Sequence, residues 1–350
     1  MKVLIVTDAW HPQINGVVRS LTEIGKQADT FGIRVHYLTP EGFSSVAMPG
    51  YPEIRLVLAT PSQIAHRIDE AAPDCIHIAT EGPLGILARR YCMKHGKKFT
   101  TSYHTHFPQY LSARLPVPSW PFAVLMRRFH AAAAATMIST KTLEDDLAGQ
   151  GYKNLMRWSR GVDADLFHPG KAVRPPFVRP IFLYAGRIAV EKNLEAFLSL
   201  DLPGSKVVAG DGPARADLEA RFPEVHFLGA HRGEALAEIY ASADAFVFPS
   251  LTDTFGVVLL EALASGVPVA AFPVAGPRDV IGNSKTGVLD KDLRRAAVGA
   301  LAIPRDLCRK YALQFSWRES ARQFFGNVLS ANGICFQDMG ALRQELETAA

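Results

Sequence analysis

The sequence predicts an α/β protein built from two doubly wound parallel sheets. Short apolar runs of strand length alternate with longer segments of helical period in both halves of the chain. This alternation is typical of parallel strands joined by crossover helices. The chain has 350 residues, which is too many for one ordinary core and about right for two domains.

Composition excludes several other classes of protein. Apolar residues make up 48% of the chain and charged residues 21%, which is typical of a globular protein and not of a disordered one. The four cysteines are widely spaced and form no CxxC pair, so we expect a reduced, cytoplasmic setting. The opening residues, MKVLIVTDAW, have too short an apolar run for a signal peptide. No stretch approaches the roughly 18 apolar residues of a membrane span.

The first half of the chain contains one complete series of strands and helices. Strands are expected at 3–7, 35–38, 75–78, 99–103 and 135–139, with a further short strand at 54–57. Helices are expected at 17–31, 62–71, 84–95 and 119–135.

A second series begins after a proline-rich segment. Four prolines within residues 169–180 predict a stiff, extended linker. Strands are then expected at 181–186, 206–210, 225–228, 245–248 and 267–272, separated by helical segments. We therefore expect an N-terminal domain at 1–168, a linker at 169–180, a C-terminal domain at 181–328 and a tail at 329–350.

The stretch 248–269 combines a strand end, a polar turn and a helix with one expected apolar face. Asp253 lies in the turn and Glu261 two turns along the helix. Open α/β sheets bind ligands where strands end and helices begin. Backbone amides from Thr254 to Val257 can hold an anion, and a carboxylate beside them can accept hydrogen bonds from hydroxyls. Amides for phosphate and acids for hydroxyls together suit a nucleotide sugar.

Two more loops of the second series follow strand ends. Arg187 and Lys192 flank a helix start in the stretch 185–193, and two cations with free amides suit a diphosphate. A solvated loop with a capping pair is an equal alternative. Gly210 opens Gly-Asp-Gly-Pro, which allows a tight turn beside a base or ribose but mostly indicates turn chemistry.

Polar groups also follow strands of the first series. Gly16 ends the first loop and opens a helix, so backbone could approach a phosphate or sugar there, although an ordinary turn is an equal alternative. The loop is not GxGxxG, which disfavours a nicotinamide dinucleotide. His104 follows a strand and could contact a sugar hydroxyl or serve the fold. His104 and His106 point to opposite faces of an extended segment, and Asp163 and Asp165 have no further acids nearby, so we expect no metal site.

Positive charge is concentrated in the first half. Residues 1–170 carry 18 Lys and Arg against 14 Asp and Glu, whereas the remainder carries 20 of each. No acid occurs between Glu81 and Glu144, and residues 107–130 mix aromatic and apolar residues with arginines. The composition suits a segment that contacts an anionic membrane, through Arg114, Trp120, Arg127 and Arg128. An ordinary core helix with a solvated arginine pair is the alternative, and the lack of acids favours the membrane.

In their order along the chain, these pieces resemble the retaining glycosyltransferases of family GT4, which have the GT-B fold. The resemblance extends from the Asn15-Gly16 loop to Phe315-Ser-Trp317. It depends on the glycine loop, His104, Arg160-Gly-Val-Asp163, Gly186-Arg187 with Glu191-Lys192-Asn193, Gly210-Asp-Gly-Pro213, and the stretch from Pro249-Ser250 to Gly266. The family carries an acid, seven residues and a Glu. Here Asp253 and Glu261 hold those places, and Asp253 is shorter than the usual Glu.

The resemblance implies two Rossmann-like domains facing a cleft, the first for the acceptor and the second for the nucleotide sugar. It implies that Arg187 and Lys192 bind the donor diphosphate and act in catalysis, and that Glu261 binds the ribose. It also implies that Asp253 and the amides near Thr254, Phe255 and Gly256 bind the sugar, with His104 near the anomeric centre and Gly16 close to the donor. Such enzymes generally need no metal or cofactor, and their last helix, here 317–330, usually crosses back to the first domain.

The expected activity is hexosyl transfer from a UDP- or GDP-sugar to an acceptor such as diacylglycerol, at the inner face of a membrane. The expected mechanism is a same-face substitution in which the β-phosphate helps deprotonate the acceptor, because no second carboxylate is evident for a double displacement. No nucleic acid partner is expected. Three alternatives stay open: transfer to a polysaccharide or lipopolysaccharide precursor, sugar-nucleotide epimerisation, and a non-catalytic binding role.

Overall fold

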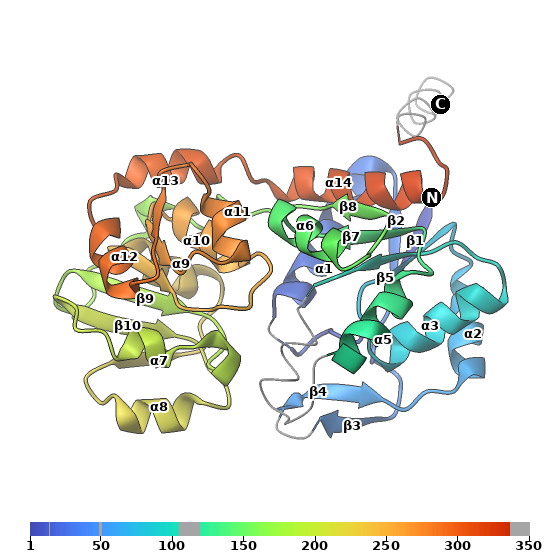
Figure 1. Cartoon of the computed structure of the whole chain (residues 1–350), viewed down its shortest axis with the longest axis horizontal. Helices are drawn as coiled ribbons and strands as arrows, with labels where there is room; N and C mark the ends of the chain where they lie inside the picture. Colours follow the sequence, from blue (N-terminus) through green and yellow to red (C-terminus); the bar gives the residue numbers. More distant parts are fainter. Residues whose placement is uncertain (14, 49–50, 105–119, 337–350) are drawn as a thin grey trace. The chain divides into compact units, whose positions relative to one another are not determined.

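The computed structural model describes residues 1–13, 15–48, 51–104 and 120–336 (Figure 1). The chain forms two compact units, and each contains a six-stranded sheet. Unit 1 comprises Met1–Ser159 and Trp317–Ala350, and unit 2 comprises Arg160–Ser316. Every strand pair in both sheets is parallel, which confirms the predicted α/β class with two doubly wound sheets.

The sheet of unit 1 has the strand order β2-β1-β5-β6-β7-β8. Its strands are β1 (Lys2–Val6), β2 (Arg34–Leu38), β5 (Cys75–Ile78), β6 (Thr100–Ser102), β7 (Ala135–Ile138) and β8 (Leu155–Arg157). The short strand expected at 54–57 belongs instead to a separate antiparallel pair, β3 (Ser45–Met48) and β4 (Tyr51–Val57). The sequence analysis did not anticipate β8, which has only three residues and partial burial.

Helices cover both faces of the unit 1 sheet. They are α1 (Gly16–Gln27), α2 (Pro61–Ala71), α3 (Pro83–Lys94), α5 (Trp120–His130), α6 (Lys141–Gly149) and α14 (Trp317–Ala331). The strand β5 shows the two faces. Its Ile76 and Ile78 pack with residues of α2 and α3, whereas its His77 lies edge-on against Phe324 of α14. The alternation follows from the two-residue period of a strand.

Unit 2 has the strand order β11-β10-β9-β12-β13-β14. Its strands are β9 (Ile181–Ala185), β10 (Ser205–Ala209), β11 (His226–Gly229), β12 (Ala245–Phe248), β13 (Val269–Ala271) and β14 (Gly287–Leu289). Its helices are α7 (Glu195–Leu198), α8 (Arg215–Arg221), α9 (Gly233–Ser242), α10 (Val257–Ala264), α11 (Ala275–Ile281), α12 (Leu293–Ala300) and α13 (Arg305–Ala312). Phe246 and Phe248 of β12 face one core cluster, and Ala245 and Val247 face the other.

The unit boundaries differ from the positions expected at 168 and 328. The chain passes into unit 2 at Arg160, and α14 belongs to unit 1, where Trp158 Nε1 donates to Ser320 Oγ over 3.0 Å. The proline-rich segment 169–180 packs along unit 2, since Val173 N donates to Ser242 Oγ over 2.9 Å. Prolines predict an extended chain, but they do not tell whether that chain lies against a surface or bridges two domains.

Candidate active site

The candidate donor site lies where the strands of unit 2 end. Because neighbouring parallel strands end at the same edge of a sheet, the loops after β9, β10 and β12 come together there. The contact between two of these loops is close. A Cβ built on Gly210 would lie 1.9 Å from the carbonyl oxygen of Gly186, so a side chain at position 210 would separate the two loops. The Tyr184 hydroxyl donates to the carbonyl of Arg187 over 2.8 Å and stabilises the loop after β9.

Lys192 and Asp253 meet across this edge. The Nζ of Lys192 lies 2.6 Å from Oδ1 of Asp253, and the two side chains are 25% and 22% exposed. A second contact ties the same loops together, because Asn193 Nδ2 donates to the carbonyl of Pro249 over 3.1 Å. The two loops are separated by about 60 residues of sequence, and strand order brings them side by side.

The electrostatics of Asp253 favour its charged form. Burial raises the pKa of this carboxyl, but the Lys192 ammonium outweighs burial and holds the pKa below its usual value. Oδ2 of Asp253 is buried and has no hydrogen-bond partner among the described residues. The Ser250 hydroxyl of the same loop also helps to lower the pKa of this carboxyl.

Helix α10 starts beside this pair. Gly256 precedes the helix with a φ of 82° and has no side chain with which to cap the first turn. Thr254 and Phe255 are buried in the loop before it. Uncapped amides at a helix start attract an anion.

Glu261 lies within α10 and is only 1% exposed. The prediction that this helix has a single apolar face is wrong, because every residue from Leu259 to Ala264 is buried. Carboxylates are rarely buried this fully, so Glu261 is a candidate for a functional role.

The predicted residues of unit 1 lie at the carboxyl edge of its own sheet. Gly16 is the first residue of α1, and a Cβ built there would meet nothing within 4 Å. Asn15 caps the helix, with its Oδ1 accepting from Val17 N and Val18 N over 3.0 Å each. His104 follows β6, and its ring lies 5.9 Å from the ring of buried Trp158 in an edge-on arrangement.

No metal centre is found in the part of the chain that the structure describes, since no three His, Cys, Asp or Glu side chains gather there. Asp163, considered above for a metal, caps a turn instead: its Oδ1 accepts from Asp165 N over 3.2 Å and from Leu166 N over 3.0 Å. His106 and Arg114 lie outside the described residues.

Helices α3 and α5 share an exposed surface of mixed character. Arg89 of α3 donates to the carbonyl of Phe129 over 2.9 Å and joins the two helices. Trp120 is 68% exposed, and Arg127 and Arg128, two turns further along α5, are exposed as well. We call this the α3–α5 surface; its exposed residues are Ile86, Arg90, Met93, Lys94, Trp120, Val124, Leu125, Arg127 and Arg128. Among the described residues, no helix has the length and hydropathy that crossing a membrane requires.

Two family models match the chain. The model for Glycosyltransferase Family 4 matches residues 14–166, and the model for Glycosyl transferases group 1 matches residues 179–302. A GDP-mannose-dependent alpha-mannosyltransferase of Mycobacterium tuberculosis (strain CDC 1551 / Oshkosh) is 32% identical over 323 residues, which cover 83% of each chain. The chain belongs to glycosyltransferase family 4. It is a nucleotide-sugar-dependent transferase with the GT-B fold.

Further similarities agree with this membership. The sulfoquinovosyl transferase SQD2 of Arabidopsis thaliana is 33% identical to this glycosyltransferase over 299 residues, which cover 77% of this chain and 58% of the plant protein. Among solved structures, sucrose-phosphate synthase (tll1590) from Thermosynechococcus elongatus has the same fold, with a TM-score of 0.72, 18% identity and full coverage of both chains.

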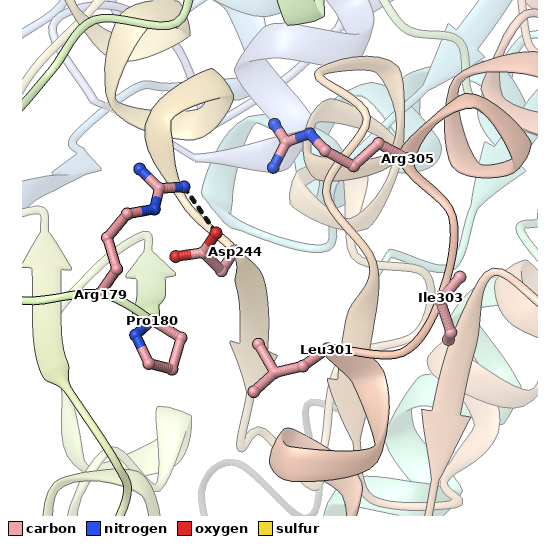
Figure 2. Close-up of a pocket in the computed structure, with 6 residues that line it drawn as sticks. All are labelled: Arg179, Pro180, Asp244, Leu301, Ile303 and Arg305. Carbon is pink, nitrogen blue, oxygen red and sulfur yellow. Dashed lines mark hydrogen bonds and ion pairs between the residues drawn. The ribbon is translucent and has the colours of Figure 1, made fainter.

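A pocket lies at the amino ends of the unit 2 strands, opposite the candidate donor site, and its charged residues stabilise the fold of the glycosyltransferase. Figure 2 shows Arg179 and Asp244 in contact on one side of it, with Arg305 on the other side. Arg179 pairs with Asp244 at 2.5 Å, and Asp244 also accepts from Ile181 N over 2.7 Å. Arg305 donates to the carbonyls of Ala241 and Ala243 over 2.6 Å each. Arg179 pairs with Asp244, and Asp244 and Arg305 bind backbone groups of the chain. The pocket is therefore a poor candidate for binding substrate.

The sequence analysis did not single out Ser250 as a site residue. Ser250 follows β12 and is fully buried, and its hydroxyl oxygen has no hydrogen-bond partner among the described residues. It lies in the same loop as Asp253, and its hydroxyl helps to lower the pKa of the Asp253 carboxyl. In the sequence, Ser250 is recognisable only as a serine shortly after a buried strand, as many turn residues are. Its burial, which only the structure shows, distinguishes it from an ordinary turn residue.

Proposed function

We propose that this glycosyltransferase moves a hexosyl group, with retention of configuration, from a UDP- or GDP-sugar to a membrane lipid. The observation that carries the donor half is the group of Arg187, Lys192, Asp253 and the α10 start at one sheet edge. The mannosyltransferase relative uses GDP-mannose, which makes GDP-mannose the first donor to test.

In this proposal each end of the donor has its own residues. Arg187, Lys192 and the α10 amides bind the diphosphate, since guanidinium, ammonium and free amides all favour phosphate oxygens. Glu261 accepts hydrogen bonds from the ribose, and Gly210 lets the base or ribose lie close to the backbone. Asp253, with the amides near Phe255 and Gly256, accepts or donates hydrogen bonds to the sugar.

The leaving nucleoside diphosphate is the group whose charge the enzyme must stabilise. Negative charge grows on the β-phosphate as the glycosidic bond breaks, and Lys192 and Arg187 would stabilise that charge without a metal. The acceptor oxygen attacks from the face that the diphosphate leaves, and the β-phosphate takes the acceptor proton. His104 of unit 1 would lie near the anomeric centre, and Gly16 would let the first loop approach the donor.

The α3–α5 surface supports a lipid acceptor. Trp120, Val124 and Leu125 are exposed apolar side chains, although burying them would be favourable. Arginines and lysines on the same helices would attract an anionic leaflet, and each contributes about 1 kcal/mol near such a surface. We therefore propose a peripheral contact with the inner face of a membrane, where the acceptor is held.

A donor and acceptor screen tests the proposal. The protein is incubated with GDP-mannose, UDP-glucose or UDP-glucuronic acid and a lipid extract, and products are identified by mass spectrometry. The expected product is a hexosyl lipid from one donor. An epimerised nucleotide sugar without acceptor product would contradict the proposal, as would a product confined to added glycans.

A further inference from the structure

Glu81 is a carboxylate at the carboxyl edge of the unit 1 sheet that the proposed function leaves without a role. It lies between the end of β5 and the start of α3. Its side chain is 21% exposed, and its Oε1 lies 3.2 Å from Nε2 of His130. Among the described residues, His130 is the hydrogen-bond partner of this carboxylate.

His130 is itself held by a buried network. The residue is only 2% exposed, and its Nδ1 lies 2.9 Å from Oγ1 of Thr101. Oγ1 of Thr101 lies 3.1 Å from Oγ1 of Thr136. With a proton on Nε2 the imidazole donates to Glu81, and its Nδ1 continues the chain of hydrogen bonds through Thr101 to Thr136. The network therefore fixes the direction in which the carboxylate of Glu81 presents its second oxygen.

Asp8, the carboxylate after the neighbouring strand β1, has a different task. It accepts from Leu84 N over 2.9 Å, from Gly85 N over 3.3 Å and from the Thr80 hydroxyl over 2.9 Å. Burial raises the pKa of Asp8 against the opposing effect of these hydrogen bonds. Asp8 thus occupies the anion-binding start of α3 as part of the fold.

The other helix starts at this edge also carry caps from the chain. Asn15 caps α1, and the hydroxyl of Thr140 accepts from Leu143 N at the start of α6. In the described part of unit 1, the helix starts that follow β1, β5 and β7 are therefore capped by side chains. At these loops the unit 1 sheet presents the carboxylate of Glu81 instead of free amides. A carboxylate accepts hydrogen bonds from hydroxyls and repels phosphate.

We propose that Glu81, oriented by His130, binds a hydroxyl of the acceptor, and that the acceptor headgroup is neutral at this point. A glycerol or sugar headgroup fits, whereas a phosphorylated headgroup would bring like charges together. The inference rests on the proposed function and names the acceptor class for it. Anionic lipids would attract the α3–α5 surface, and a neutral lipid in the same leaflet would be glycosylated.

The test compares three acceptors with GDP-mannose and UDP-glucose as donors: dioleoylglycerol, phosphatidylinositol and octyl mannoside, in the same mixed micelles. We expect kcat/KM with a neutral acceptor to exceed that with phosphatidylinositol by about tenfold or more. Glu81→Gln keeps the shape and removes the charge. It should raise the KM for the neutral acceptor about tenfold, as expected for a hydrogen bond to a charged group. The KM for donor and the acceptor-free hydrolysis of donor should not change.

Two further variants separate positioning from folding. Glu70→Gln, on an exposed residue of α2, is the matched control and should behave as the unmodified protein. His130→Gln should also raise the acceptor KM. The double variant, with His130→Gln and Glu81→Gln together, should have an acceptor KM no higher than that of the single variant with the higher KM. Both substitutions act through one contact. Additive losses would contradict the positioning role of His130.

Different outcomes would contradict the role of Glu81 and the lipid acceptor. An active enzyme that prefers phosphatidylinositol, or a Glu81→Gln variant with unchanged acceptor KM, overturns the inference and leaves the proposed function standing. Transfer to octyl mannoside alone contradicts the lipid acceptor, while a raised KM in Glu81→Gln would still support the role of Glu81. Transfer to none of the three acceptors contradicts both.

Discussion

Lys192 Nζ lies 2.6 Å from Asp253 Oδ1, so the cation proposed for the donor diphosphate and the carboxylate proposed for the donor sugar are paired with each other. The pair is mostly buried, so the cost of removing both charges from water offsets much of their attraction. A donor would replace it on both sides, with phosphate oxygens at Lys192 and sugar hydroxyls at Asp253. The ion pair therefore keeps both groups charged and in place at the sheet edge.

Replacing Lys192 by Ala should abolish most of the transfer activity. The diphosphate loses a charged partner whose contact strengthens as the leaving group forms, so kcat should fall at least about a hundredfold. Steady-state rates with the donor found in the screen measure this. Lys310→Ala, on an exposed residue of α13, is the matched control and should leave the rate unchanged. Full activity in Lys192→Ala would show that the diphosphate role is wrong.

Replacing Asp253 by Glu should change which sugar is accepted. The longer side chain moves the carboxylate by about the length of one methylene group, while the charge that pairs with Lys192 is kept. The ratio of kcat/KM between GDP-mannose and UDP-glucose should change by about tenfold or more, with little loss of thermal stability. An unchanged ratio would argue that Asp253 does not contact the sugar.

Two glycines should respond differently to the same substitution. Gly210→Ala places a Cβ against the Gly186 carbonyl, so the variant should lose on the order of 2 kcal/mol of stability. Gly16→Ala meets no atom within 4 Å, so its stability should stay within about 0.5 kcal/mol of the unmodified protein. If the donor approaches the first loop, Gly16→Ala should nonetheless raise the donor KM. Thermal melting and donor kinetics together separate the two effects.

The buried His77 should make stability depend on pH. Burial lowers its pKa from 6.5 to about 3, and its ring nitrogens contact the hydroxyls of Thr100 and Ser102. Between these pH values the unfolded chain binds a proton that the folded chain does not. Stability should therefore fall as the pH drops from about 6.5 toward 3, with a slope of up to about 1.4 kcal/mol per pH unit.

A variant isolates this contribution from other titrating groups. His77→Gln should be less stable at pH 7, and the gap to the unmodified protein should narrow as the pH falls. Urea unfolding at pH 7.0, 5.5 and 4.5 measures the gap. A gap that stays constant over this range would mean that His77 titrates as it does in the unfolded chain, and a gap that widens would mean that it is charged in the fold.

The α3–α5 surface should bind anionic vesicles. Flotation with anionic vesicles, but not with neutral ones, is the expected result for the unmodified protein. Arg127→Glu with Arg128→Glu should abolish it, because the exposed basic charge is reversed. Arg174→Glu with Lys310→Glu makes the same charge change on exposed residues of unit 2 and should have no effect. Equal flotation with both vesicle types, or with neither, would contradict the membrane contact.

Local pattern predicted most of the framework. Buried runs such as 75–78 and 245–248 were located to the residue, because a short apolar run between turn residues is typical of a buried strand. The three-residue strands β8 and β14 were missed, since both are only partly buried and lack a continuous apolar run, whereas the equally short but buried β6 and β13 were located. The helix start at Gly256 and the loops after β9 and β12 could be placed because each follows a clear strand.

The sequence by itself determined the α/β class, the motif order that marks the family, and the candidate residues of the donor site, because each depends on neighbours along the chain. Only the tertiary structure decided that Lys192 pairs with Asp253, that the chain passes into unit 2 at Arg160, and that Glu81 is oriented by a buried His130. Such contacts join residues far apart in the sequence. Strand order and burial create them, and neither can be read from local composition.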